Sequence, residues 1–401
     1  MQSNRRVILA IAALCFALSS PLSAQTPSGA PIKIGSTIAL TGPLGASGLI
    51  HKLSGEIYVE NLNKRGGLLG RPVEWVLKDD QSRPDVTRTI YEQLVTVDKV
   101  DLLMGPYATG PILSALGVAQ RYNKLLINHT NGMPHLAKYD GQFPTSGIPA
   151  NPDSAFPHTV FGAVSQSNKP PKTIAIVTSK FPSAQFISLG ARKIADKYGM
   201  KEVVYLEWEF GNRDFGPIAA RIKDAKPDML WAGTLGLEAN LLIDAMKKID
   251  YVPPAQFYLF PAPGPLAKSP DAKFAMSMST FEQHAPFINA PGAAAFVKVF
   301  NERATKAGMP DNSVELQSSV SYAGWQTLEA AVNATKSIDD KVLIAWLKKN
   351  RVRTIIGELR FDGPYNHSLE SRYHLKQVQD GKWNIVWPRE VAAPGVKLIM
   401  P

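Results

Sequence analysis

The chain of 401 residues contains a single cysteine, Cys15. Cys15 lies within a segment, residues 1–24, that has the layout of a removable export signal, so we expect the mature chain to contain no thiol. A chain without thiols cannot form disulfides, Cys-ligated zinc sites, iron–sulfur clusters or a cysteine nucleophile. Leu14 precedes Cys15, where a lipoprotein signal needs a small side chain, so we do not expect lipidation either.

The expected export signal rests on three features of residues 1–24. Arg5 and Arg6 form a basic start, residues 7–18 form an apolar stretch, and Ser23 and Ala24 form a small-residue end. The apolar stretch is shorter than the ~20 residues that a membrane-spanning helix needs. We therefore expect cleavage after residue 24 and export of the remaining chain.

Long apolar runs and clusters of one charge are also scarce. The mature sequence has no second apolar stretch of ~18 residues, so we expect it to be soluble. The formal net charge is +10, and it falls to +8 when Arg5 and Arg6 leave. Lys and Arg are scattered along the chain, whereas nucleic-acid-binding proteins usually gather them on one stripe. We do not expect this protein to bind nucleic acid.

The motifs of common enzyme classes are missing as well. The sequence has no Walker phosphate loop, no His-Glu-x-x-His zinc pair and no Gly-x-Ser-x-Gly elbow. The glycine-containing loop 42–48 lies between a strand and a helix, but its spacing is not that of a dinucleotide site. Asp79 and Asp80 have no third oxygen ligand nearby in the sequence, and the histidines show no ligand spacing. We therefore predict no enzyme activity, no cofactor and no metal site.

Strand and helix patterns alternate along the chain. In the first half, strands are predicted at 32–40, 73–77, 101–104 and 124–128, and helices around 50–57 and at 85–98 and 111–122. The β-branched run 173–178 starts a second series, with helices around 187–198 and at 216–224 and 237–249, and strands at 203–208, 228–232 and 256–260. Two such series predict an α/β protein with two doubly wound parallel-sheet lobes. A mature chain of this length also exceeds the ~250 to 300 residues of one core.

The rest of the chain is less regular. Residues 140–157 are rich in Gly, Pro and Ser and show no helical period, so we interpret them as the first crossing between the lobes. A strand is predicted at 277–281, followed by helices at 292–307, 318–335 and 339–349 and a strand-rich tail from 354 to 401.

Several motifs occur in an order that resembles one known family. They are Lys33–Gly35, Leu40–Pro43, Asn61–Arg71, Lys78–Ser82 and Met104–Pro106. Together they resemble exported solute-binding proteins similar to the leucine/isoleucine/valine-binding protein, over nearly the whole mature chain. The resemblance implies the type I periplasmic-binding fold, in which three crossings join two lobes and the ligand is enclosed in the cleft between them. It also implies a periplasmic location and delivery of the ligand to a membrane ABC permease.

On that fold we divide the mature chain into two discontinuous lobes. Lobe 1 is expected to comprise residues 31–150 and 281–355, and lobe 2 residues 151–280 and 356–401. The crossings are expected near 147–152, 279–281 and 355–358, and we expect the lobes of a monomer to close on the ligand about these segments.

Two loops of lobe 1 are the predicted anion site. Ligands of open α/β sheets sit beyond the carboxyl ends of the strands, where helix N-termini offer free N–H groups. The resemblance implies that the Thr109 hydroxyl and the backbone N–H groups of Thr130 and Gly132 hold a ligand carboxylate. The alternative is that Thr109 is only a helix N-cap. Tyr107, Ala108 and Asn131 belong to the same loops, and Ser47 matches a position whose side chain covers the ligand.

Loops of lobe 2 should supply the opposite wall of the cleft. The candidates are Phe181, Ser183, Leu235, Phe260 and Ala262, although Phe181 and Phe260 could instead belong to the lobe core. Ala262 stands where amino-acid-binding members place an acid against the ligand ammonium. The nearest acids in the sequence are Glu238 and Asp271.

A buried ammonium without a carboxylate partner is strongly disfavoured. The missing acid therefore predicts an aromatic or aliphatic carboxylate without an amino group as the ligand, with branched-chain or other neutral amino acids as the alternative. A ligand-sensing regulator of the same fold would normally lack an export signal, and a secreted enzyme would need a nucleophile or a metal.

Overall fold

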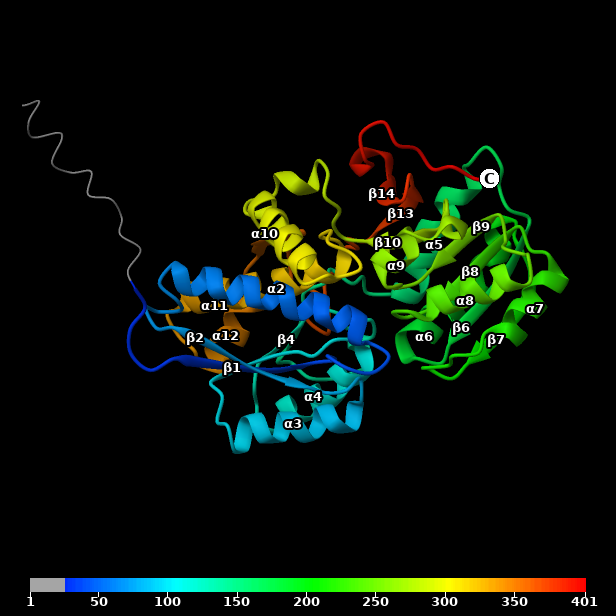
Figure 1. The fold of residues 1–401 in the computed structure, drawn as a ribbon. Helices are drawn as coiled ribbons and strands as arrows, with labels where there is room; N and C mark the ends of the chain where they lie inside the picture. The colour runs from blue at the N-terminus through cyan, green and yellow to red at the C-terminus, as the bar shows by residue number, and fades with distance from the viewer. Residues whose placement is uncertain (1–25) are drawn as a thin grey trace, which may run out of the picture.

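The computed structural model describes residues 26–401, and the predicted export signal lies outside them (Figure 1). The described residues form two large sheets, each with helices on both faces, and a separate two-stranded sheet. No helix within residues 26–401 is long and apolar enough to cross a membrane.

The first sheet has the strand order β2-β1-β3-β4-β5, and all its neighbouring strands are parallel. The strands are β1 (Ile32–Ile38), β2 (Val73–Asp79), β3 (Leu102–Met104), β4 (Leu126–Asn128) and β5 (Gln142–Pro144). Helices α3 (Pro84–Thr96) and α4 (Thr109–Arg121) pack together on one face. The other face is covered by α2 (Gly45–Lys64) and α11 (Leu316–Thr335), against which α10 (Ala293–Lys306) and α12 (Asp340–Leu347) pack.

The second sheet has the order β14-β13-β10-β9-β8-β6-β7. The parallel strands are β6 (Thr173–Ser179), β7 (Lys201–Trp208), β8 (Met229–Gly233), β9 (Ala255–Tyr258) and β10 (Met276–Ser279). An antiparallel hairpin of β13 (His374–Gln379) and β14 (Lys382–Trp387) extends the sheet beyond β10. Helices α5 (Pro152–Ser165) and α6 (Pro182–Ile194) form one contacting pair, α7 (Gly216–Ala225) and α8 (Glu238–Lys248) another, and α9 (Pro263–Ala267) contacts α8.

Burial explains why these segments form strands. Positions Ile174 to Ser179 of β6 and all positions of β8 are buried, as expected of strands covered by helices on both sides. The alternating pattern of the sequence therefore predicts the two-sheet α/β fold correctly. Short 3₁₀ turns complete the chain at Pro134–Leu136, Ala195–Tyr198, Pro270–Ala272, Phe287–Asn289 and Arg389–Val391.

The segment 140–157 differs from its prediction as an irregular crossing. It contains the edge strand β5 and the first residues of α5, which starts at Pro152. Proline is well placed in a first helical turn because its missing N–H would have no partner there. Pro157 inside the same helix breaks the helical sequence pattern, and this explains why α5 was not predicted.

The third crossing also lies later than predicted. Strands β11 (Val352–Thr354) and β12 (Gly357–Leu359) form a hairpin, and β11 packs on α11. Phe361 then packs edge-on against Phe143 of β5, with ring centroids 5.1 Å apart, and Asn366 Nδ2 donates to the Asp140 carbonyl at 2.7 Å. The chain therefore leaves the first sheet after Asn366, about ten residues beyond the proposed division at 356. Arg372 N–H donates to the Gly147 carbonyl at 3.2 Å, so the first and third crossings touch.

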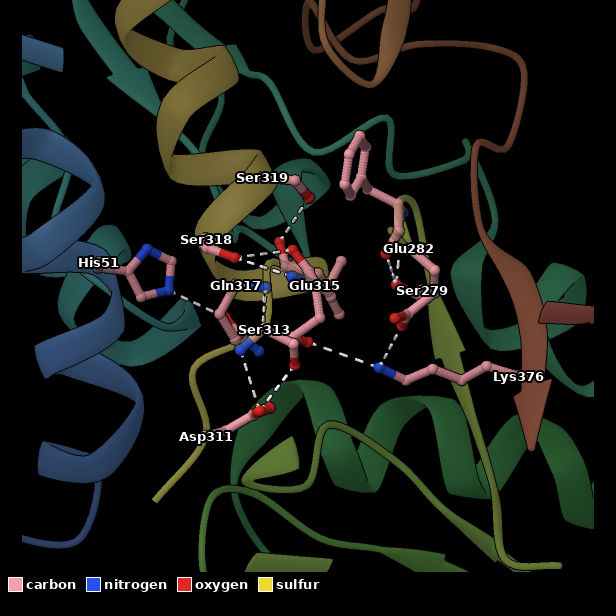
Figure 2. Close-up of polar contacts among 12 residues, drawn as sticks. His51, Ser279, Glu282, Asp311, Ser313, Glu315, Gln317, Ser318, Ser319 and Lys376 are labelled. Carbon is pink, nitrogen blue, oxygen red and sulfur yellow. Dashed lines mark hydrogen bonds and ion pairs between the residues drawn. The ribbon is translucent and has the colours of Figure 1, made fainter. Parts of the chain in front are cut away.

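A buried ion cluster joins the second crossing to both sheets (Figure 2). The ammonium of Lys376, on β13, lies 3.0 Å from the carboxylate of Glu282 and 3.5 Å from that of Glu315. Glu282 follows β10, and Glu315 caps the first turn of α11 by accepting from the Gln317 N–H at 2.7 Å. Burial raises the pKa of Glu282 to about 7, although Lys376 opposes this shift. Burial disfavours the charge on Lys376, but the two carboxylates outweigh it and raise its pKa.

We expect Lys376→Met to lower the free energy of unfolding by about 3–5 kcal/mol at pH 8, because two buried carboxylates lose their cation. The loss should be smaller at pH 5.5. A raised folded pKa means that the contribution of Glu282 is full below its ordinary pKa and is lost as pH rises through about 7. At pH 5.5 Glu282 is therefore mostly protonated and depends less on Lys376. Urea unfolding at the two pH values measures both effects.

Lys180→Met is the matched control, because the Lys180–Glu209 pair is exposed. Exposed pairs contribute about 0–1 kcal/mol, so this variant should unfold close to wild type. Equal losses for Lys376→Met at pH 5.5 and pH 8 would contradict the proposed titration of Glu282.

Candidate functional site

A narrow cavity lies between the two sheets. The centres of water-sized molecules could occupy only about 30 Å³ of it, so the two lobes are closed around it. Its lining comes from loops of both sheets, from the start of α11 and from two crossings, and none of these lining residues carries a formal charge. They are Tyr107, Ala108, Thr109, Thr130, Asn131, Gly132, Ile148, Ser183, Leu235, Phe260, Leu316, Gln317, Val320 and Tyr373.

On the first-sheet side, the loop after β3 is hydrogen-bonded to the loop after β4. Ala108 N–H donates to Thr130 Oγ1 at 3.0 Å, and Gly132 N–H donates to Thr109 Oγ1 at 3.0 Å. Ala108 has φ of 72°, a conformation that costs energy for a residue with a side chain and that clusters at functional sites. The Gly132 N–H, predicted to face a ligand, is therefore used within the protein. The Thr109 hydroxyl still has its proton available for an acceptor in the cavity.

On the second-sheet side, Ser183, Leu235 and Phe260 reach the cavity as predicted from their loops. Ser183 approaches Gly132 so closely that a Cβ on Gly132 would lie 2.7 Å from the Ser183 Cβ. Only glycine allows this contact between the lobes. Phe260 has φ of 50°, so a second lining residue also has strained backbone.

Three predicted site residues do not line the cavity. Phe181 packs edge-on against Phe210, with ring centroids 4.9 Å apart, and its ring also approaches Gly110 of α4. Ala262 is buried in a turn, where its N–H donates to the Gly236 carbonyl at 2.7 Å. Ser47 is fully buried in the first turn of α2, behind Tyr107. Burial raises the pKa of the Tyr107 phenol to about 12, and Ser47 opposes this shift.

The acids considered as ammonium partners are also absent from the cavity lining. The Glu238 carboxylate accepts from Trp208 Nε1 at 2.9 Å and from Leu235 N–H at 3.0 Å, and burial raises its pKa. Asp271 forms an ion pair with Lys247 at 2.8 Å. The lack of an acid is therefore a property of the whole lining and does not depend on position 262.

Five lining residues were not predicted. Ile148 lies in the loop after β5, and the other four come from segments far along the chain from the predicted loops. Ile148 and Tyr373 lie on the first and third crossings, and Leu316, Gln317 and Val320 lie on α11. The capping box of Glu315 and Ser318 marks the start of α11 and could have placed the helix end more precisely. It could not have shown that this end meets the loops of the first sheet.

Two buried histidines stand behind the cavity wall. The His51 ring stacks on His129 with centroids 4.7 Å apart and lies 4.6 Å from the Tyr107 ring. His51 Nε2 lies 2.9 Å from Gln317 Oε1 (Figure 2). Burial lowers the pKa of His51 to about 4, against the opposing hydrogen bond to Gln317. Burial, helped by His51, lowers the pKa of His129 well below its usual value. Within residues 26–401 no group of His, Cys, Asp and Glu has the arrangement of a metal site.

We expect His51 to remain neutral at pH 5.5, where a free histidine is about nine-tenths protonated. Its lowered folded pKa stabilises the protein above the ordinary histidine pKa, and this contribution is lost as pH falls towards about 4. NMR of ¹⁵N-histidine-labelled protein would follow the titration, with His51→Asn identifying the His51 signal. A midpoint above pH 6 would contradict the expected neutral ring.

The chain is similar to known solute-binding proteins in both sequence and structure. The family model for "periplasmic binding protein" matches residues 31–382. Leu/Ile/Val-binding protein homolog 1 of Brucella melitensis is 26% identical over 382 residues, covering 92% of this chain and 97% of the relative. The structure of a leucine-binding protein from Thermotoga maritima aligns with a TM-score of 0.76 at 18% identity, covering 90% and 99% of the two chains. An ABC-transporter solute-binding protein from R. palustris in complex with benzoate aligns with a TM-score of 0.75 at 19% identity, covering 93% and 99%.

Proposed function

The chain belongs to the periplasmic binding protein family, and we propose that it captures a small carboxylate without an amino group and delivers it to a membrane ABC permease. Proteins of this family are exported and bind solutes for ABC transporters. We further propose that residues 1–24 direct this chain to the periplasm and that it binds its ligand without transforming it.

The uncharged lining of the cavity is the observation that carries the ligand proposal. The Thr109 hydroxyl at the start of α4 offers a proton to an anion, and the helix N-terminus adds partial positive charge. An ammonium group buried in the same cavity would meet no carboxylate, which is energetically costly. An anionic ligand without an amino group is therefore favoured over an amino acid.

The rest of the lining favours an apolar body on the ligand. Ile148, Leu235, Phe260, Leu316 and Val320 present aliphatic or aromatic surface to the cavity. The benzoate bound to the R. palustris protein is an acid of this kind. The name of the Brucella relative favours a second candidate, branched-chain amino acids.

The small size of the cavity indicates how the ligand enters. So little space lies between the closed lobes that the lobes must part to admit a carboxylate. The short crossings are the segments about which we propose this opening, with each lobe moving as a rigid body.

A thermal-shift panel separates the two ligand candidates. We expect benzoate-type acids or short fatty acids to raise the melting temperature by several degrees, because a ligand that binds only the folded state stabilises it. Leucine and valine should have little effect. A clear shift with leucine or valine, together with none from any amine-free acid, would show that the ammonium does find a partner.

We expect Thr109→Ala to weaken binding of such an acid by roughly 10- to 150-fold, because it removes a hydrogen bond of ~1.5 to 3 kcal/mol to a charged group. Thr109→Ser keeps the hydroxyl and should retain most of the affinity. Thr89→Ala, on the exposed side of α3, controls for loss of a helical threonine hydroxyl. Calorimetry decides the question, and a loss below about threefold would show that Thr109 only joins the two loops through Gly132.

A further inference from the structure

The side-chain amide of Gln317 brings a hydrogen-bond donor to the cavity at the start of α11. The Gln317 side chain lines the cavity and is only 3% exposed. Its carbonyl oxygen Oε1 lies 2.9 Å from His51 Nε2 (Figure 2). Its amide nitrogen Nε2 has no hydrogen-bond partner among residues 26–401. A donor that faces a cavity loses its water when a ligand fills the cavity, and this costs about 1–3 kcal/mol if the ligand supplies no acceptor.

The contact with His51 orients this amide. The Gln317 oxygen Oε1 faces His51 Nε2, an arrangement that pairs with a His51 ring carrying its proton on Nε2. The His51 ring is itself held between Tyr107 and His129. With Oε1 bound to His51 outside the lining, the NH₂ group is the part of the amide left for the cavity.

The backbone of Gln317 is held as firmly as its side chain. Its N–H donates to the Glu315 carboxylate at 2.7 Å, and Glu315 is anchored by Lys376 of the second sheet. Ser318 completes the capping box through its hydroxyl, which accepts from the Glu315 N–H at 2.9 Å. The donor therefore occupies a set position when the lobes are closed.

We infer that the ligand carries, in addition to its carboxylate, a neutral oxygen that accepts a hydrogen bond from Gln317 Nε2. This inference rests on the proposed function and specifies its ligand as a hydroxy- or oxo-substituted monocarboxylate. A second carboxylate does not fit, because no cation lines the cavity and the buried Glu315 lies directly behind Gln317. A site built to hydrogen-bond a substituent discriminates against analogues that lack it.

Matched pairs of acids test the inference on the wild-type mature chain by calorimetry. The pairs are 4-hydroxybenzoate with benzoate, 3-hydroxybenzoate with benzoate, and 4-oxopentanoate with pentanoate. We expect the oxygen-bearing acid of at least one pair to bind about 2- to 10-fold more tightly, the range for one net neutral hydrogen bond. 4-Methylbenzoate controls for filling of space and 1,4-benzenedicarboxylate for a second charge, and neither should gain affinity.

Gln317→Met then removes the donor while keeping an unbranched side chain of similar length. It should abolish the preference within the pair, so that the two acids of the pair bind with the same affinity. Gln120→Met, on the exposed face of α4, is the matched control and should keep the preference. Thr109→Ala should weaken the binding of both acids of a pair by the same factor, so this measurement separates the role of Thr109 from that of Gln317.

Two results would overturn the inference. One is a wild-type protein that binds the unsubstituted acid of every pair as tightly as its partner, a result that needs no variant to fold. The other is a preference that survives in Gln317→Met. If no amine-free acid binds at all, the proposed binding of an amine-free carboxylate is wrong. This inference depends on that proposal and is then wrong as well.

Discussion

The buried cation Lys376 fixes how the two lobes meet. It lies on a strand of the second sheet and contacts one carboxylate on the second crossing and another at the start of α11, which packs on the first sheet's side. Buried ion pairs often contribute little net stability, because desolvation offsets their attraction. Their directional contacts instead determine which segments come together. Here they set the position of the helix end that presents Leu316 and Gln317 to the cavity.

The cavity walls are held in place by the protein's own hydrogen bonds. Ala108 donates to Thr130 and Gly132 donates to Thr109, so the loops after β3 and β4 form one unit. The strained backbone of Ala108 and Phe260 is maintained by the packing around these positions. Groups fixed in this way lose little conformational freedom when a ligand binds, and this reduces the entropic cost of capture.

Local rules predict which strand-end loops of the first sheet line the cavity. Tyr107, Thr109 and the loop from Thr130 were predicted because the carboxyl ends of parallel strands meet at one edge of a sheet. Local rules do not decide which way a loop side chain points, so Phe181 turned towards Phe210 and Ala262 into a turn. Gln317 was missed for another reason. It lies far along the chain from β3, and only the tertiary contacts of α11 bring it to the cavity.

The cavity lining is neutral, while its charges lie one layer behind. Glu315 and Lys376 neutralise each other there, and burial keeps His51 and His129 uncharged. A carboxylate held by neutral donors and a helix N-terminus is bound less strongly than one paired with a buried arginine. A solute-binding protein has to release its ligand to a permease, and weaker binding of the carboxylate makes that release easier. Separation of the lobes would take Ser183, Leu235 and Phe260 away from Thr109 and Gln317, so opening alone would remove the second-sheet side of the wall and favour release.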